Sequence, residues 1–252
     1  MEITSYIIAS IAAVLAGFIN AIAGGGTLIT FPTLTALGIP PIVANVTNTL
    51  ALCPGYFGGI FAQRKNFKSQ KDRLWKLLPV SIIGGLTGGF LLLKLPESSF
   101  KILIPYLILI ATALLAFQVP LKNWSVSHEH KGSKLLKNTG MYFLIFIAAV
   151  YGGYFGAGLG VILMGVLGTA LNESLNKINI LKQTLAFVIN VTAAIYFAFS
   201  GKAEWFFVLT MAFGAIIGGF IGGKMVDKIP AAILRYIVVI IGCTVALVYF
   251  LK

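Results

Sequence analysis

Long apolar runs separated by short polar connections follow one another from one end of the chain to the other. The first run covers residues 3–23 and stops at Gly24, Gly25 and Gly26. A second run, 28–37, starts directly afterwards. About 20 apolar residues cross a bilayer as a helix, so only the first run is long enough. The pattern predicts a membrane helix that breaks at the glycines and continues as a short second helix.

The later runs give the same picture. They cover residues 42–62, 74–93, 102–117, 141–150, 161–171, 178–199, 205–221 and 231–251. A second glycine-rich interruption, 151–160, separates the run at 141–150 from the short one that follows it. The sequence therefore predicts an all-α polytopic membrane protein with about eight to ten crossing segments. Whether the short segments 27–38 and 159–171 cross fully or re-enter on one side is left open.

The two halves of the chain share landmarks in the same order. Thr49-Leu-Ala recurs as Thr184-Leu-Ala, and Gly88-Gly-Phe recurs as Gly218-Gly-Phe. Internal repeats of this kind are typical of transporters. We expect a first membrane repeat at 1–119, a cytoplasmic linker at 120–138 and a second membrane repeat at 139–252. About five segments per repeat, an odd number, would make the repeats inverted.

Charge supports this topology. The chain is 58% hydrophobic and 10% charged, with a net charge of +12. Most of its lysines and arginines lie in connections that share one side if the N-terminus is outside; the exceptions are Lys94, Lys101, Lys202 and Lys252. Basic connections face the cytoplasm, so we expect these there and expect no nucleic-acid partner. The expected partners are membrane lipid and a small anion, and the oligomeric state is left open.

The glycine interruptions are the first candidate site. A helix that restarts after a break has backbone N–H groups without partners, and these favour an anion. Bare backbone inside a membrane is tolerated only where it is buried in protein or lines a cavity. Gly24, Gly25, Gly26 and Thr27 would then face Gly156, Gly158 and Gly160. The alternative is that the glycines serve only close helix packing.

Polar side chains in the following segments extend the site. Asn179, Lys182, Gln183 and Asn190 fall on one helical face, and Asn45, Asn48 and Thr49 match them in the first half. Amides inside a membrane face the protein interior, where they bind either a ligand or another helix. Lys182 is either the counter-charge of an anion or a side chain that reaches the surface. Asn20 and Thr192 are weaker candidates.

Catalytic and metal-binding patterns are missing from the sequence. The acidic residues lie at or near the ends of segments, so a buried carboxylate relay for proton coupling is not predicted. His128 and His130 fall in the linker, and no nucleophile–base pair is present. We expect no enzyme activity, no cofactor and no metal site.

These motifs resemble the sulfite exporter TauE/SafE family of membrane permeases. The similar segments are 17–32, 37–40 and 44–49 in the first half, and 153–158, 182–184 and 201–205 in the second. The resemblance implies two repeated bundles in the cell membrane of a bacterium or archaeon. It also implies transport of small anionic sulfur compounds or sulfonates, usually outward.

We therefore expect a secondary transporter in which an oxyanion sits between the two glycine breaks. Backbone N–H groups, Asn48, Thr49, Gln183 and Thr184 would hold it, and one repeat would rock against the other. The anion's own gradient and the membrane potential would drive it, with sodium coupling left open. The alternatives are a channel or uniporter for another small solute, and a membrane scaffold that transports nothing.

Overall fold

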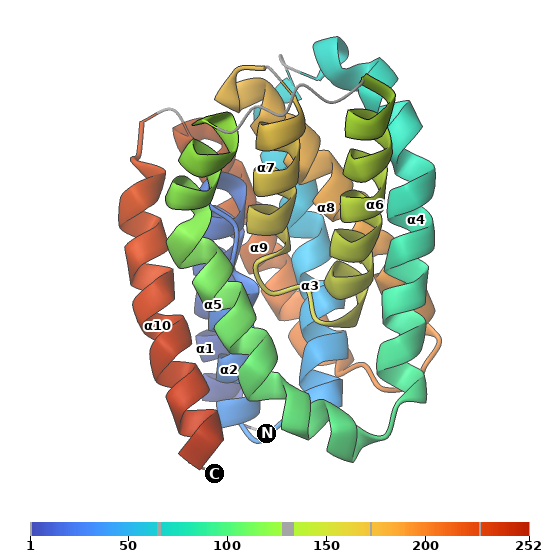
Figure 1. The fold of residues 1–252 in the computed structure, drawn as a ribbon. Coiled ribbons are helices and arrows are strands. Elements are labelled where there is room, and N and C mark those ends of the chain that lie inside the picture. The colour runs from blue at the N-terminus through green and yellow to red at the C-terminus, as the bar shows by residue number, and fades with distance from the viewer. Residues whose placement is uncertain (1, 65–66, 128–133, 172, 227, 252) are drawn as a thin grey trace.

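The computed structural model describes residues 2–64, 67–127, 134–171, 173–226 and 228–251. Within these ranges the chain forms a bundle of α-helices and no strand (Figure 1). In chain order the elements are α1 (Ile3–Ile22), α2 (Thr27–Ala36), α3 (Pro41–Ala62), the 3₁₀ turn η2 (Lys68–Gln70), α4 (Lys71–Lys94), α5 (Glu97–Ser127), α6 (Lys134–Tyr154), α7 (Leu159–Ala170), α8 (Leu175–Ala198), α9 (Trp205–Met225) and α10 (Ala231–Leu251).

The predicted all-α membrane fold is confirmed. Among the described residues, 6 helices are long and apolar enough to cross a membrane: α1, α4, α8, α9 and stretches of α5 and α10. Both chain ends lie at the same end of the bundle, as do the α4–α5 and α8–α9 connections (Figure 1). We call this the terminal end. The opposite end, where α4 begins at Lys71 and α8 begins at Leu175, we call the basic end. The predicted linker 120–138 is partly helical, since α5 continues to Ser127 and α6 begins at Lys134.

Both predicted helix breaks are present. α1 ends at Ile22 and α2 begins at Thr27, and α6 ends at Tyr154 and α7 begins at Leu159. Gly24 and Gly158 have φ angles of 85° and 72°, a region that side chains with a Cβ atom rarely adopt. The chain reverses here at little cost, so α2 and α7 run back beside α1 and α6 as short helices of 10 and 12 residues.

The two sequence halves exchange their fourth helices. α9 packs against α1 and α3 of the first half, whereas α4 packs against α6 and α8 of the second. This makes an α9 unit (α1, α2, α3 and α9) and an α4 unit (α4, α6, α7 and α8). α5 packs against α7 and α10 against α2, and α5 and α10 also contact each other. Each of these pairings has its counterpart when the halves are interchanged, which is consistent with an inverted repeat.

Glycines make these helix contacts close. On α9, Gly214, Gly218 and Gly222 face the backbone of α1, and a methyl group added at Gly218 would overlap the carbonyl of Val14. The neighbouring face of α9 presents Gly219 and Gly223 to α3. Helices in a membrane gain little from the hydrophobic effect, so close backbone approach is a main source of their association.

α4 uses the same device in the other unit. Gly84 and Gly88 lie against α6, with Gly88 next to the carbonyl of Val150, and Gly85 and Gly89 lie against α8. Glycine faces on α4 and α9 therefore hold both units together.

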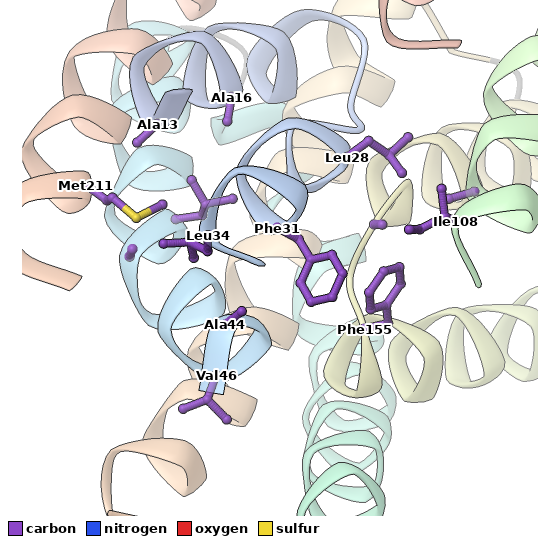
Figure 2. Packing of buried hydrophobic residues seen from close by; sticks show 14 of the residues in the cluster. Ala13, Ala16, Leu28, Phe31, Leu34, Ala44, Val46, Ile108, Phe155 and Met211 are labelled. Atoms are coloured by element: carbon purple, nitrogen blue, oxygen red, sulfur yellow. The ribbon is translucent and has the colours of Figure 1, made fainter. Parts of the chain in front are cut away.

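Aromatic side chains close the space between the breaks and the terminal end. Phe31 of α2 meets Phe155, the first residue after α6, edge to face with ring centroids 5.2 Å apart (Figure 2). Phe100 of α5 packs against both rings. All three side chains are buried, so they form an apolar cluster on this side of the breaks.

Replacing Gly218 with alanine is expected to lower the free energy of unfolding by about 1–3 kcal/mol, because α1 and α9 must separate to admit the methyl group. Thermal unfolding of the purified protein in detergent measures this. Gly165→Ala is the matched control, since a methyl group there meets no atom within 4 Å. Equal melting temperatures for the two variants would contradict the packing role of Gly218.

Candidate functional site

The two helix breaks meet in the middle of the protein. A methyl group added at Gly24 would lie 3.2 Å from the Cα atom of Gly160 and equally close to the nitrogen of Val161. The first break, which leads into α2, and the N-terminal end of α7 are thus in backbone contact. The sequence led us to expect an oxyanion directly between Gly24 and Gly160. In this conformation it does not fit there, because the two backbones are already in contact.

Backbone donors are available beside this contact. Within the described part of the chain, the N–H groups of Thr27 and Gly160 have no hydrogen-bond acceptor. The N–H of Gly26 donates to Oδ1 of Asn20 over 2.7 Å. Each helix N-terminus also contributes about half a positive charge from its dipole. The meeting point of α2 and α7 is therefore electropositive.

Lys182 lies at the same place. Its side chain is only 1% exposed, and its Nζ atom donates to the backbone carbonyl of Asn20 over 3.4 Å. Its alkyl chain passes Gly160, where an added methyl group would lie 3.7 Å from Cδ. Lys182 of α8 therefore points between the breaks, and the alternative that it reaches the surface is wrong.

Lys182 has no carboxylate partner among the described residues. The ion pairs found there join Arg73 with Glu173, Lys101 with Glu97, and Lys177 with Glu173. Burying an amine without a counter-charge is costly when it is protonated. A bound anion would supply that charge.

Two asparagines tie each broken helix to the other unit. Nδ2 of Asn45 on α3 donates to the carbonyl of Tyr154, the last residue of α6, over 2.9 Å. Nδ2 of Asn179 on α8 donates to the carbonyl of Ala21, near the end of α1, over 3.2 Å, and to Oε1 of Gln63 over 2.9 Å. Both side chains bind carbonyl groups that a broken helix leaves free, so they support the breaks.

Asn48 and Gln183 occupy corresponding positions in the two halves, but the structure does not bring them together. Each is 1% exposed, and Oδ1 of Asn48 and both polar atoms of Gln183 have no hydrogen-bond partner. Nε2 of Gln183 would lie 2.9 Å from a methyl group added at Gly59. Gly59 is about 16 Å from Asn48 along α3. The two amides are available for a ligand, but at separate points.

The other predicted site residues are engaged locally. The hydroxyls of Thr49 and Thr184 donate to carbonyls of their own helices, and so does the amide of Asn190. Gly25 and Gly158 pack against side chains of neighbouring helices, and Gly156 lies in the second break. The structure therefore gathers a smaller set than predicted: Asn20, Gly24, Gly26, Thr27, Gly160 and Lys182. His128 and His130 lie outside the described residues.

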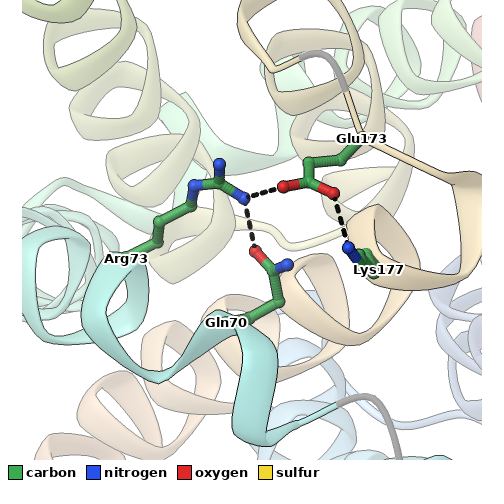
Figure 3. Close-up of polar contacts among 4 residues, drawn as sticks. All are labelled: Gln70, Arg73, Glu173 and Lys177. Atoms are coloured by element: carbon green, nitrogen blue, oxygen red, sulfur yellow. Dashed lines mark hydrogen bonds and ion pairs between the residues drawn. The ribbon is translucent and has the colours of Figure 1, made fainter.

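Sequence reasoning missed an ion-pair cluster at the basic end (Figure 3). Nη1 of Arg73 lies 2.6 Å from one oxygen of Glu173 and donates to Gln70, and Nζ of Lys177 lies 3.0 Å from the other oxygen. The Arg73 and Lys177 donors hold the pKa of the Glu173 carboxyl below its usual value. Only the i, i+4 spacing of Glu173 and Lys177 could have been recognised in the sequence.

Comparison with known proteins now identifies the family. The family described as "Sulfite exporter TauE/SafE" matches this chain over residues 9–249. The chain belongs to this family. A protein of Haemophilus influenzae named a probable membrane transporter protein is 32% identical, over 90% of this chain and 88% of its own. One from Sinorhizobium sp, named probable membrane transporter protein ORF9, is 30% identical over 94% and 89%.

The probable membrane transporter protein YfcA of Escherichia coli K12 is 26% identical, over 93% of this chain and 85% of its own. No solved structure matches the chain. Membership of the TauE/SafE family, together with the apolar helices, indicates a multi-pass membrane transporter.

Replacing Asn179 with alanine is expected to cost about 1–3 kcal/mol of stability, because the carbonyl of Ala21 and Oε1 of Gln63 stay buried without their donor. Thermal unfolding in detergent checks this. Thr244→Ala is the control: its exposed hydroxyl also donates to a carbonyl, that of Ile240 in its own helix. If Asn179→Ala and Thr244→Ala have the same melting temperature, the hydrogen bonds of Asn179 across the units contribute nothing to stability.

Proposed function

We propose that this member of the TauE/SafE family is a secondary transporter of a small anion, of the class of sulfite, organosulfonates and related sulfur oxyanions. The anion binds at Lys182, beside the N-termini of α2 and α7. Asn20 positions this site through its contacts with Gly26 and Lys182.

The observation that supports this proposal is the buried amine of Lys182 without a carboxylate partner among the described residues. Two helix N-termini add partial positive charge at the same point. Neutral groups such as Asn20 lower the cost of burying this charge but do not cancel it. An oxyanion cancels it and also accepts hydrogen bonds from the amine and the free N–H groups.

The substrate class comes from the family. Its description names sulfite exporters, and small oxyanions have the charge and the acceptor atoms that such a site requires. The relatives are named only as probable membrane transporters. Transport assays therefore determine which sulfur compound is carried.

Alternating access follows from the packing of the units. The glycine contacts bind α9 to α1 and α3, and α4 to α6 and α8. These units, rather than the sequence halves, are the bodies that move. Few polar bonds cross between them at the breaks, chiefly those of Lys182, Asn45 and Asn179. Separation of Gly24 from Gly160 admits the anion from one side at a time.

The orientation follows from charge. The basic end faces the cytoplasm of a bacterial or archaeal cell and the N-terminus lies outside. The inside-negative membrane potential then favours outward movement of the anion.

Lys182→Met, which keeps the length of the side chain and removes its charge, is expected to slow anion flux about 10- to 100-fold, the loss of one hydrogen bond to a charged group. Lys182→Arg should retain more flux. The measurement is uptake and efflux by proteoliposomes with sulfite, methanesulfonate, sulfate and formate. Lys202→Met, an exposed lysine of the terminal end, is the control.

Wild-type flux in Lys182→Met would exclude Lys182 as the anion site. Flux without stimulation by internal substrate would indicate a channel or uniporter. Flux of none of the anions, together with no thermal shift on adding them, would favour a scaffold that transports nothing.

A further inference from the structure

A cavity of about 180 Å³ opens at the basic end, away from Lys182. It is lined by Arg73, Lys76 and Leu77 of α4, Met141 and Tyr142 of α6, and Leu171. Since a water molecule occupies about 30 Å³ in the liquid, the cavity has room for a phosphate group. None of these side chains belongs to the proposed transport site.

The charge of this cavity is positive and partly unused. Lys76 is exposed and makes no hydrogen bond or ion pair with any described residue. Arg73 contacts Glu173 and Gln70 through Nη1 alone. The ion pair with Glu173 also shows that the guanidinium of Arg73 can hold an oxyanion group. The remaining donors of Arg73 and Lys76 suit a phosphate.

The surface around the cavity suits a lipid. Trp75, the neighbour of Lys76, is 66% exposed, and exposed tryptophan is enriched where a membrane meets water. Further along the same two helices, Ile83 of α4 and Phe143 and Ile147 of α6 are exposed apolar side chains. They extend from the basic end toward the middle of the bundle, as acyl chains would.

We propose that this cavity binds the phosphate of an anionic phospholipid, with Arg73 and Lys76 on the head group and the exposed apolar side chains of α4 and α6 against the acyl chains. A free phosphate has the same head-group chemistry, but it would make no use of the apolar surface. The site is separate from anion transport, so it stands whether or not the proposed function holds.

The test measures binding of phosphatidylglycerol to the purified protein in detergent, by native mass spectrometry and by thermal shift. Phosphatidylcholine and inorganic phosphate are the comparison ligands. Lys76→Gln breaks no hydrogen bond or ion pair with a described residue and is expected to weaken phosphatidylglycerol binding about fivefold, the effect of one lost charge near a membrane surface. Glu173→Gln, which frees Arg73, is expected to strengthen it. Lys101→Gln, at the terminal end, is the control.

A preference for phosphatidylglycerol over phosphatidylcholine that is reduced in Lys76→Gln and kept in Lys101→Gln supports the site. Equal binding of both lipids, or equal effects of Lys76→Gln and Lys101→Gln, would overturn it. A shift of the same size from inorganic phosphate would overturn the lipid and leave a free-anion site. These results do not depend on transport, so they test the lipid site even if the protein transports no anion.

Discussion

In the interior, the first break, which leads into α2, meets the N-terminus of α7 beside the side chain of Lys182, and no described carboxylate pairs with its amine. Each helix end contributes about half a positive charge, and isolated charge in a low-dielectric interior is costly. The rest of the site reduces this cost without removing it: Asn20 accepts from Gly26 and Lys182, and Asn45 and Asn179 bind the carbonyl ends of the helices that precede the breaks. Under the proposed function the arrangement is most stable when an anion is bound, which would link binding to the conformation of the breaks.

Glycine makes this arrangement sterically possible at two levels. At the breaks, Gly24 and Gly158 adopt left-handed backbone angles and let the chain reverse inside the bundle. Away from the breaks, the glycines of α4 and α9 bring helices of opposite halves into backbone contact. The result is two interlocked units whose internal contacts are close, while the polar bonds between them at the breaks are few. Such a division allows rigid movement of one unit against the other around a central site.

The sequence predicted the helix breaks because a run of glycines interrupts the apolar pattern, and it predicted the buried face of α8 because Asn179, Lys182, Gln183 and Asn190 share a helical spacing. It did not decide the position of Lys182, since a lysine near the start of a helix can reach the surface equally well. It also did not reveal the exchange of α4 and α9, because a glycine face indicates close packing without naming the partner. Asn45 and Asn179 both donate to backbone carbonyls at the ends of broken helices, and such acceptors have no residue signature. Arg73 and Glu173 are too far apart in the chain for their pairing to be recognised.

The most direct test of the central site uses selenite, an electron-dense analogue of sulfite, in crystals of the protein. Anomalous diffraction at the selenium edge locates the anion without reference to transport. An anion bound at Lys182 would give a peak in the core, with anion oxygens about 2.7–3.2 Å from Nζ of Lys182 and the N–H groups of Thr27 and Gly160. Peaks only at surface lysines and arginines, with none beside Lys182 at saturating selenite, would contradict the proposed site.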